Sequence, residues 1–424
     1  MAQAPETKNV TFTLDGKQVT APHGTTIWHV ARDADIDIPH LCYKDADGYR
    51  ADGNCRACMV EIDGERVLAA SCQRVATDGM IVHSATERAT KARAMVMELL
   101  VADQPRRTDS HDPSSQLWHY AEEQQVDHSR FPGKKAPHPD SSHPAIAVNM
   151  DACIQCNLCV RACREVQVND VIGLAGRGAD AHIIFDFGDD MGASTCVGCG
   201  ECVQACPTGA LMPKTVLDDS QKLAITPDKQ VASVCPYCGV GCQLNFHVKG
   251  EKIVAVTGRE GPANKSRLCV KGRYGFDYID NPQRLTVPLI RRDDVPKSAS
   301  LPFDPATPLT HFREASWDEA LTRAASGFSD IKQAHGASAL AGFGSAKGTN
   351  EEAYLVQKLV RQGFGTNNVD HCTRLCHASS VAALLENIGS GAVTASFSQC
   401  LHSDAIIVIG ANPTVNHPVA ATFI

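Results

Sequence analysis

The sequence predicts a chain of several domains that combines α+β and α/β architecture, and three observations lead to this prediction. The 424 residues are enough for three or four domains with cores of their own. Sixteen of the nineteen cysteines fall into four groups of four with metal-ligand spacing. Residues 405–409 form a continuous apolar run of the kind that is buried in a parallel sheet.

Composition and charge exclude several classes of protein. The formal net charge of -8 offers no basic surface, so we expect no nucleic-acid partner. No apolar run reaches the roughly 20 residues that a membrane-spanning helix needs. The first residues lack an apolar signal region and a twin-arginine pair. Cysteines at C-x2-C spacing in such a chain indicate metal binding rather than disulfides, and we expect a cytoplasmic protein.

Residues 1–84 are predicted to form a small mixed α/β domain that holds one [2Fe–2S] cluster. Asp15-Gly16 and Asp63-Gly64 are typical of hairpin turns, and a short helix is expected at 26–32. The predicted cluster ligands are Cys42, Cys55, Cys58 and Cys72. The alternatives are a zinc site or four structural cysteines. This domain resembles the plant-type ferredoxin module at the front of the large iron–sulfur subunit of respiratory NADH dehydrogenase.

Residues 85–145 are expected to form one amphipathic helix and then a solvated connector. The helix, over 85–101, carries apolar residues on one side: Ala89, Ala92, Met95, Val96, Leu99 and Leu100. The connector contains five histidines, for which metal ligation is the alternative: His111, His119, His128, His138 and His143. The NADH dehydrogenase subunit carries an extra cluster here, bound by one histidine and three cysteines. Because this chain has no cysteine between Cys72 and Cys153, we expect that cluster to be missing.

Residues 146–216 have the cysteine spacing of a bacterial ferredoxin with two [4Fe–4S] clusters. The run C-x2-C-x2-C-x3-C begins once at Cys153 and again at Cys196. In such ferredoxins the fourth cysteine of each run ligates the other cluster, so the two halves form one pseudo-symmetric unit. We therefore assign one cluster to Cys153, Cys156, Cys159 and Cys206, and the other to Cys163, Cys196, Cys199 and Cys202.

A third [4Fe–4S] cluster is predicted in a β-rich domain at 230–288, after a polar linker. Its ligands are Cys235, Cys238, Cys242 and Cys269, and strands are expected at 242–248 and 252–256. With Lys271-Gly272-Arg273, Arg284-Leu285-Thr286 and Trp317-Asp318-Glu319, this region resembles the start of a molybdopterin oxidoreductase. The resemblance implies that Lys271 lies between the cluster and the pterin. From the sequence alone, Lys271 fits a surface lysine.

Residues 289–424 are predicted to begin an α/β domain that binds molybdopterin guanine dinucleotide. A strand at 339–343 leads through a glycine-rich loop into a helix at 351–361, and such loops bind phosphates. The run at 405–409 leads into a second loop at the end of a strand, where α/β folds bind ligands. The predicted pterin contacts are Gly344, Ser345, Lys347, Asn350 (also the expected helix N-cap), Gly410, Asn412 and Pro413.

The segment 368–377 contains the residues to which we assign catalysis. With Thr349-Asn350-Glu351-Glu352, it is similar to the active-site region of molybdenum- or tungsten-dependent formate dehydrogenases. The resemblance implies that Cys376 ligates the metal, that His377 holds or passes the released proton, and that Lys271 completes the catalytic set. From the residues alone, Cys372 fits a core residue or one that supports the site, and Cys400 a structural cysteine.

The resemblance implies an oxidoreductase that converts formate into carbon dioxide, or the reverse. Its cofactors would be molybdenum or tungsten with two molybdopterin guanine dinucleotides, one [2Fe–2S] cluster and three [4Fe–4S] clusters. Electrons would pass Lys271, cross the clusters and reach a diaphorase partner that carries FMN and reduces NAD. A small [2Fe–2S] subunit is a further expected partner. A soft thiolate suits such a metal, and histidine has the side-chain pKa nearest neutrality.

Two other functions fit parts of the sequence. One is an electron-transfer subunit of an NADH dehydrogenase, and the other is the front module of a hydrogenase, both without metal–pterin chemistry. The context of Cys376 disfavours the first, and the cysteine set ending at Cys269 disfavours the second. Within the pterin class, the residues around Cys376 favour formate over nitrate. Catalytic subunits of this family are much longer, so we expect a fragment or a chain completed by a second polypeptide.

Overall fold

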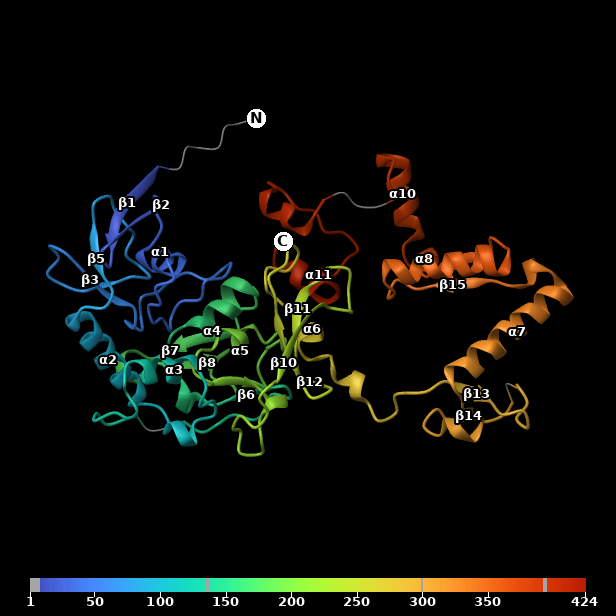
Figure 1. Ribbon diagram of the computed structural model, residues 1–424, viewed down its shortest axis with the longest axis horizontal. Coiled ribbons are helices and arrows are strands. Elements are labelled where there is room, and N and C mark those ends of the chain that lie inside the picture. The colour runs from blue at the N-terminus through green and yellow to red at the C-terminus, as the bar shows by residue number, and fades with distance from the viewer. Residues whose placement is uncertain (1–7, 135–136, 299, 392–394) are drawn as a thin grey trace. The chain divides into compact units, whose positions relative to one another are not determined.

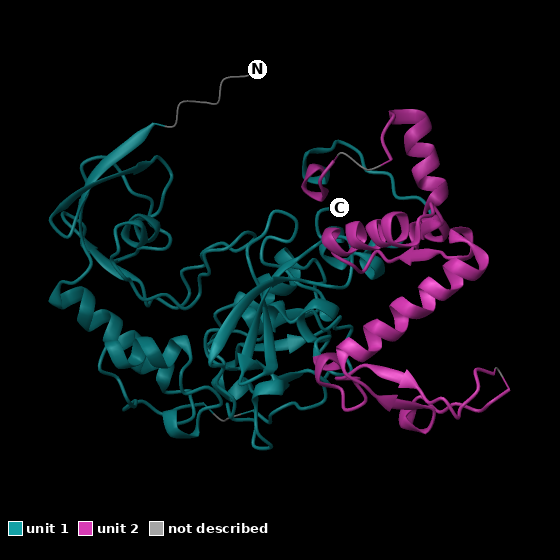
Figure 2. Cartoon of the chain, turned by 45° about the vertical axis from the view of Figure 1, so that its right-hand side comes forward, with its two compact units in different colours: residues 1–276, 400–424 teal, residues 277–399 magenta. Residues whose placement is uncertain are grey.

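The computed structural model describes residues 8–134, 137–298, 300–391 and 395–424. The chain forms two compact units, which Figure 2 shows in different colours. The first comprises 1–276 and 400–424, and the second comprises 277–399. None of the helices within the described ranges is long and apolar enough to cross a membrane.

The first unit begins with a five-stranded sheet in the order β2-β1-β5-β3-β4, accompanied by helix α1 (Figure 1). The elements are β1 (Asn9–Leu14), β2 (Lys17–Pro22), α1 (Ile27–Asp33), β3 (Met59–Ile62), β4 (Ala69–Ala70) and β5 (Ile81–His83). β1 pairs antiparallel with β2 and parallel with β5. Asp15 and Gly16 have φ of 46° and 79°, the left-handed backbone of a two-residue hairpin turn. The hairpin predicted there is confirmed.

The core of this domain includes two of the predicted cluster ligands. Phe12, Leu14 and Ile27 are buried, and Cys58 and Cys72 belong to the same cluster of side chains. Burial of each large apolar side chain contributes about 1.5–3 kcal/mol. The sheet and α1 therefore hold the cysteine-bearing loops in place.

Helix α2 (Glu87–Val101) forms where a helix was expected, but its buried side differs from the predicted one. Leu99 is 51% exposed, whereas the buried residues are Ala89, Arg93, Met97 and Val101. Arg93 faces inward because its guanidinium donates to the carbonyl oxygens of Met59 (3.1 Å) and Ser84 (2.5 Å). The prediction of an apolar face missed this arginine, whose buried charge is compensated by backbone oxygens.

The connector at 104–144 contains a buried helix, so the expectation of a solvated segment is wrong for this part. Helix α3 (Gln116–Glu123) buries Leu117, Trp118, Tyr120 and Ala121. Trp118 donates from Nε1 to Ser110 Oγ at 3.1 Å, which satisfies its polar atom inside the core. The Pro- and Ser-rich composition of the whole segment concealed this short amphipathic helix.

His111, also in the connector, contacts Asp151. Its Nε2 donates to Asp151 Oδ1 (3.1 Å) and its Nδ1 donates to Gln221 O (2.8 Å). Both ring nitrogens thus face acceptors, as a protonated imidazole requires. Burial alone lowers the pKa of His111, but these hydrogen bonds and the charge of Asp151 outweigh burial and raise it above the usual value.

Replacing His111 by asparagine is expected to remove a pH-dependent part of the stability. Because folding raises the pKa of His111, its contribution is complete below the unfolded pKa of about 6.5 and is lost as the pH rises through the folded pKa. The urea midpoint should fall as the pH rises above about 6.5, and His111→Asn should flatten this fall. The exposed His23 provides the control substitution, His23→Asn. An equal slope in wild type and His111→Asn would contradict the prediction.

The ferredoxin segment consists of two small antiparallel strand pairs, each half with a short helix. β6 (Ile146–Val148) pairs with β9 (Leu211–Pro213), β7 (Ile172–Ala175) pairs with β8 (His182–Phe185), and the helices are α4 (Leu158–Arg161) and α5 (Glu201–Ala205). Asn157 and Gly200, immediately before these helices, both have left-handed backbone with φ of 66° and 69°. The repeated geometry follows the repeat of the cysteine runs.

A three-stranded antiparallel sheet, ordered β10-β11-β12, follows in the same unit. The elements here are β10 (Lys229–Val234), β11 (Gln243–Lys249), β12 (Lys252–Gly258) and α6 (Val270–Tyr274), with α11 (Pro413–Asn416) and α12 (Pro418–Ala421) from the C-terminal residues. The two strands expected at 242–248 and 252–256 are confirmed. β10 was not predicted, because its mostly exposed residues lack a continuous apolar face.

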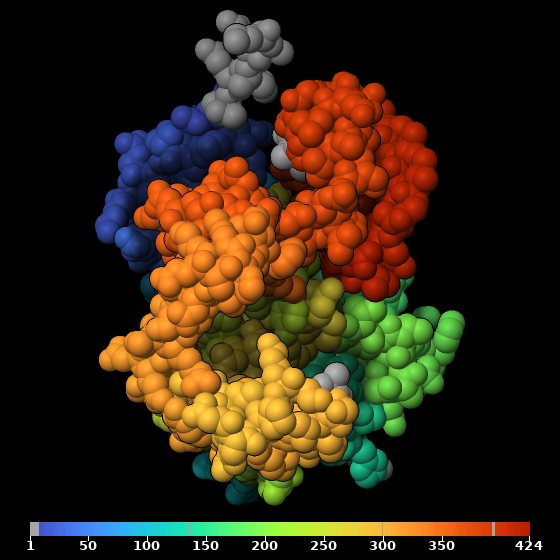
Figure 3. Space-filling model, turned by 90° about the vertical axis from the view of Figure 1, so that its right-hand side faces the viewer, coloured from blue at the N-terminus to red at the C-terminus, as the bar shows by residue number. Residues whose placement is uncertain are grey.

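The second unit contains two strand pairs and four helices among its described residues. They are β13 (Leu289–Arg291), β14 (Phe312–Glu314), α7 (Trp317–His335), β15 (Gly342–Gly344), α8 (Asn350–Lys358), β16 (Val369–His371), α9 (Thr373–Cys376) and α10 (Ala378–Ile388). β15 and β16 are parallel. Figure 3 shows the surface of α7 and its neighbours in orange.

Helix α8 begins one residue earlier than expected. Thr349, not Asn350, is its N-cap, and Thr349 forms a capping box with Glu352. The preceding strand is also shifted, since β15 starts at Gly342 and not at 339. Of the expected apolar face, Val360 is buried, whereas Leu355 and Leu359 are exposed.

The run at 405–409 is not a buried strand, so that prediction is wrong. Ile407 and Ile409 are 82% and 85% exposed, and none of the strand pairings in the described ranges includes the run. A parallel strand needs a neighbouring strand for its backbone hydrogen bonds. The apolar composition of the run does not reveal whether such a neighbouring strand exists.

Candidate functional site

The first predicted ligand set, Cys42, Cys55, Cys58 and Cys72, is brought together in the first domain. The sulfurs of Cys58 and Cys72 lie 3.4 Å apart, and the Cys55 N–H lies 3.4 Å from Cys42 Sγ. Hydrogen bonds with the thiols of Cys55 and Cys72 lower the pKa of Cys42, which favours its thiolate. Four converging thiols are the donor set that a [2Fe–2S] cluster requires.

The second set lines a small pocket, and its members are Cys153, Cys156, Cys159 and Cys206. Cys206 comes from the second cysteine run, as the ferredoxin spacing requires. Burial raises the pKa of Cys153 to about 11. Such thiols stay neutral until a bound cation compensates their charge.

The third set consists of Cys163, Cys196, Cys199 and Cys202. The thiol of Cys202 lies within electrostatic reach of the other three, including Cys163 from the first run. Burial raises the pKa of Cys199 to about 12. The reciprocal exchange between the two runs is thus present in the arrangement of the side chains.

The fourth set lines a separate small pocket, and its members are Cys235, Cys238, Cys242 and Cys269. Lys271 lies on α6, and its charge acts on the thiol of Cys235. Its Nζ donates to Val415 O at 3.4 Å.

The four cysteine sets follow one another as a series within the first unit. Cys269 precedes α6, and Arg273 on that helix donates from Nε to Cys199 O at 2.6 Å. Cys159 lies within electrostatic reach of Cys202, and Cys156 within reach of Cys42. The spatial order therefore runs from the Cys235 set through the two ferredoxin sets to the Cys42 set.

A buried ion pair that sequence reasoning missed stands beside the third set. Glu201 and Arg273 are 2% and 3% exposed, and Arg273 Nη2 lies 2.9 Å from Glu201 Oε2. Tyr49 donates its hydroxyl to Glu201 Oε1 at 3.2 Å, and Arg273 Nη1 donates to Gln204 Oε1 at 2.7 Å. The sequence does contain a signal for this burial, because Glu201 lies between the predicted cluster ligands Cys199 and Cys202.

In the second unit, two predicted site segments meet where the parallel strands β15 and β16 end. The loop after β15 contains Gly344, Ser345 and Lys347, and Asn350 begins the helix that follows. The segment after β16 contains Cys372, Cys376 and His377. The backbone N–H of Ala346 donates to Cys372 Sγ at 3.2 Å, which joins the two segments. Cys376 and His377 are both exposed.

The other predicted pterin contacts, Gly410, Asn412 and Pro413, belong to the first unit. The side chain of Asn412 accepts the N–H of Val415 at 3.3 Å and caps α11. The side-chain oxygen of Asn412 therefore already accepts a hydrogen bond within the protein.

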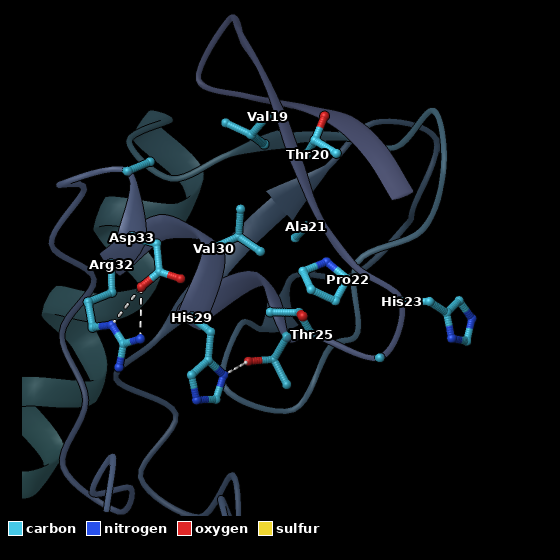
Figure 4. A pocket seen from close by; sticks show the side chains of 13 residues that line it. Val19, Thr20, Ala21, Pro22, His23, Thr25, His29, Val30, Arg32 and Asp33 are labelled. Carbon is cyan, nitrogen blue, oxygen red and sulfur yellow. Dashed lines mark hydrogen bonds and ion pairs between the residues drawn. The ribbon is translucent and has the colours of Figure 1, made fainter. Parts of the chain in front are cut away.

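A groove of about 680 Å³ beside β2 and α1 contains none of the predicted ligands (Figure 4). Its lining includes His29, whose Nδ1 lies 2.7 Å from Thr26 Oγ1, and the neighbouring pair Arg32–Asp33. No thiol faces this groove among the residues that line it, so no cluster is assigned there.

Four family descriptions match consecutive parts of the chain. Residues 7–87 match a 2Fe-2S iron-sulfur cluster binding domain, and 152–210 match a 4Fe-4S dicluster domain. Residues 228–281 match the molybdopterin oxidoreductase Fe4S4 domain, and 284–424 match the molybdopterin oxidoreductase family. The chain thus has a mixed α/β structure whose consecutive parts are similar to iron–sulfur cluster binding domains and to molybdopterin oxidoreductases.

Two curated relatives match nearly the whole chain. "Probable oxidoreductase YjgC" of Bacillus subtilis (strain 168) is 32% identical over 97% of this chain and 44% of its own length. "Putative formate dehydrogenase" of Staphylococcus aureus (strain USA300) is 29% identical over 98% of this chain and 44% of its own length. The chain therefore spans less than half the length of these relatives. Among solved structures, a chain of NAD+-reducing [NiFe]-hydrogenase is 29% identical, with a TM-score of 0.44 over 48% of this chain and 87% of that one.

Proposed function

We propose that the chain carries the metal–pterin site of a formate dehydrogenase, which oxidises formate to carbon dioxide or catalyses the reverse. The observation that carries this proposal is the contact between Ala346 and Cys372 Sγ (3.2 Å) at the end of β15 and β16. It places a glycine-rich loop, suited to phosphates, beside a segment with a thiol suited to a soft metal. The name of the Staphylococcus aureus relative supports formate as the substrate.

Each residue of the site has a defined task in this proposal. The glycine-rich loop after β15, with Gly344, Ser345, Lys347 and Asn350, would contact the phosphates of the dinucleotide. Gly410, Asn412 and Pro413 stay predicted contacts of the same cofactor. Cys376 holds molybdenum or tungsten through its thiolate. The bound cofactor supplies the capacity to accept hydrogen and two electrons from formate. His377 receives the proton on its imidazole nitrogen.

Electrons leave past Lys271 along the series of cysteine sets. Three [4Fe–4S] clusters occupy the sets that contain Cys235, Cys202 and Cys153, and one [2Fe–2S] cluster occupies the set that contains Cys42. The order of the sets in the structure supports this route. A diaphorase partner with FMN then reduces NAD in the cytoplasm, accompanied by a small [2Fe–2S] subunit.

Metal analysis of the protein purified with its native partners tests the proposed function. Molybdenum or tungsten together with about fourteen irons is expected, the sum for one [2Fe–2S] and three [4Fe–4S] clusters. Formate-dependent dye reduction is expected in the same sample. Iron without molybdenum or tungsten, and without formate activity, would overturn the proposal in favour of an electron-carrying subunit.

Replacing His377 by alanine in the metal-loaded complex is expected to slow formate-dependent dye reduction by roughly 10²–10⁴-fold, the usual contribution of a proton-transfer group. The dependence of the rate on pH should also change. Because His377 is exposed, the substitution leaves the packing intact. His335→Ala, at the exposed end of α7, is the control. Unchanged turnover and an unchanged profile in His377→Ala would disprove the assignment.

A further inference from the structure

Helix α6 joins two neighbouring cysteine sets. At its start, Cys269 is the N-cap, and a Cβ atom on Gly272 would lie 3.3 Å from Cys235 Sγ. At its end, Arg273 and Tyr274 reach the third set, which contains Cys199 and Cys202. The five residues of α6 thus extend from one cluster site to the next.

The hydroxyl of Tyr274 is buried beside the third set without a hydrogen-bond partner among the described residues. It lies against Gly200, where an added Cβ atom would come within 2.4 Å of the hydroxyl oxygen. Gly200 precedes α5 with φ of 69°, so both the backbone and the close approach require glycine. The thiols of Cys196, Cys199 and Cys202 lie within electrostatic reach of the same hydroxyl.

A buried hydroxyl without a hydrogen-bond partner destabilises the folded protein, whereas phenylalanine would fill the same space without that cost. Arg273, the basic group beside this hydroxyl, already donates to Cys199 O, Gln204 and Glu201. The hydrogen-bond acceptor for the Tyr274 hydroxyl is therefore expected to be a sulfur of the bound cluster, because cluster sulfurs accept hydrogen bonds.

We propose that Tyr274 donates its hydroxyl hydrogen to a sulfur of the [4Fe–4S] cluster held by Cys163, Cys196, Cys199 and Cys202, and thereby raises the reduction potential of that cluster. The inference rests on the cluster assignment proposed above. Reduction adds an electron to the cluster, and a hydrogen-bond donor stabilises the more negative state. Electron transfer from the Cys235 cluster, at the other end of α6, is thereby favoured.

The test is a redox titration of the intact complex in which electron paramagnetic resonance follows each cluster. Tyr274→Phe is expected to shift the midpoint potential of this one cluster to a more negative value. At a fixed solution potential, the ratio of reduced to oxidised cluster should then fall roughly tenfold, the effect of losing one hydrogen bond to a charged group. The other clusters should keep their midpoints. Tyr120→Phe is the matched control, because that buried hydroxyl contacts Gln116 and His40 instead.

A second measurement compares the deuterons that couple to this cluster. In protein exchanged into deuterium oxide, electron–nuclear double resonance should detect in wild type a coupled deuteron that Tyr274→Phe lacks, besides those of the backbone N–H groups that donate to Cys163 Sγ and Cys196 Sγ. An unshifted midpoint in Tyr274→Phe, or no such deuteron in wild type, would overturn the inference while leaving the cluster assignment intact. Absence of the cluster signal in wild type would overturn both.

Discussion

Cys376→Ser is expected to reduce formate-dependent dye reduction at least roughly a thousandfold, the scale seen when a group acting in the transition state is removed. Serine offers a harder oxygen in place of a soft thiolate and holds molybdenum or tungsten poorly. Cys376 is exposed at the end of the four-residue helix α9, so its loss leaves no cavity. Iron content and cluster spectra should therefore stay at wild-type values while molybdenum or tungsten is lost.

Cys372 provides the matched control for this experiment. Its sulfur accepts the N–H of Ala346 at 3.2 Å, and a serine hydroxyl preserves an acceptor at that position. Cys372→Ser should therefore keep most of its activity. The reverse pattern, with an active Cys376→Ser and an inactive Cys372→Ser, would move the metal ligand to Cys372.

Glu201→Ala is expected to destabilise the first unit by roughly 3–5 kcal/mol, the range for removing one partner of a buried ion pair. The substitution would leave the guanidinium of Arg273 buried without its counter-charge and would remove the acceptor of the Tyr49 hydroxyl. The urea midpoint of cluster bleaching at neutral pH measures the loss. Combining Glu201→Met with Arg273→Met should recover much of the stability, because it removes both charges together.

The surface pair Arg313–Glu319 is the control for this prediction. Both side chains are 45% exposed, so water screens their interaction. Glu319→Ala should leave the urea midpoint nearly unchanged, because exposed ion pairs contribute little to stability. Equal losses in Glu201→Ala and Glu319→Ala would refute the role of the buried pair.

The cysteine spacing predicted which thiols gather, because covalent spacing and cluster geometry constrain each other strongly. Cys206 joins the set of Cys153, and Cys163 joins the set of Cys196, as the repeated run implied. Hairpin turns were equally predictable, since Asp15-Gly16 needs a backbone that few residue pairs adopt. These are local constraints that the residues themselves impose.

Long-range packing could not be predicted in the same way. Arg93 and Glu201 are charged, yet both are buried because distant carbonyls or a distant guanidinium compensate them. The run at 405–409 has the composition of a buried strand but lacks a neighbouring strand in the described ranges. In each case the outcome depends on a partner far along the chain, which hydrophobic periodicity does not report.

The exchange of Cys163 and Cys206 between the two runs also bears on how the protein matures. Each thiol set takes three members from one run and one from the other, and β6 pairs with β9 across the whole segment. Neither set can close until the chain from 146 to 213 has come together. Assembly of either thiol set is thus tied to folding of both halves of the segment.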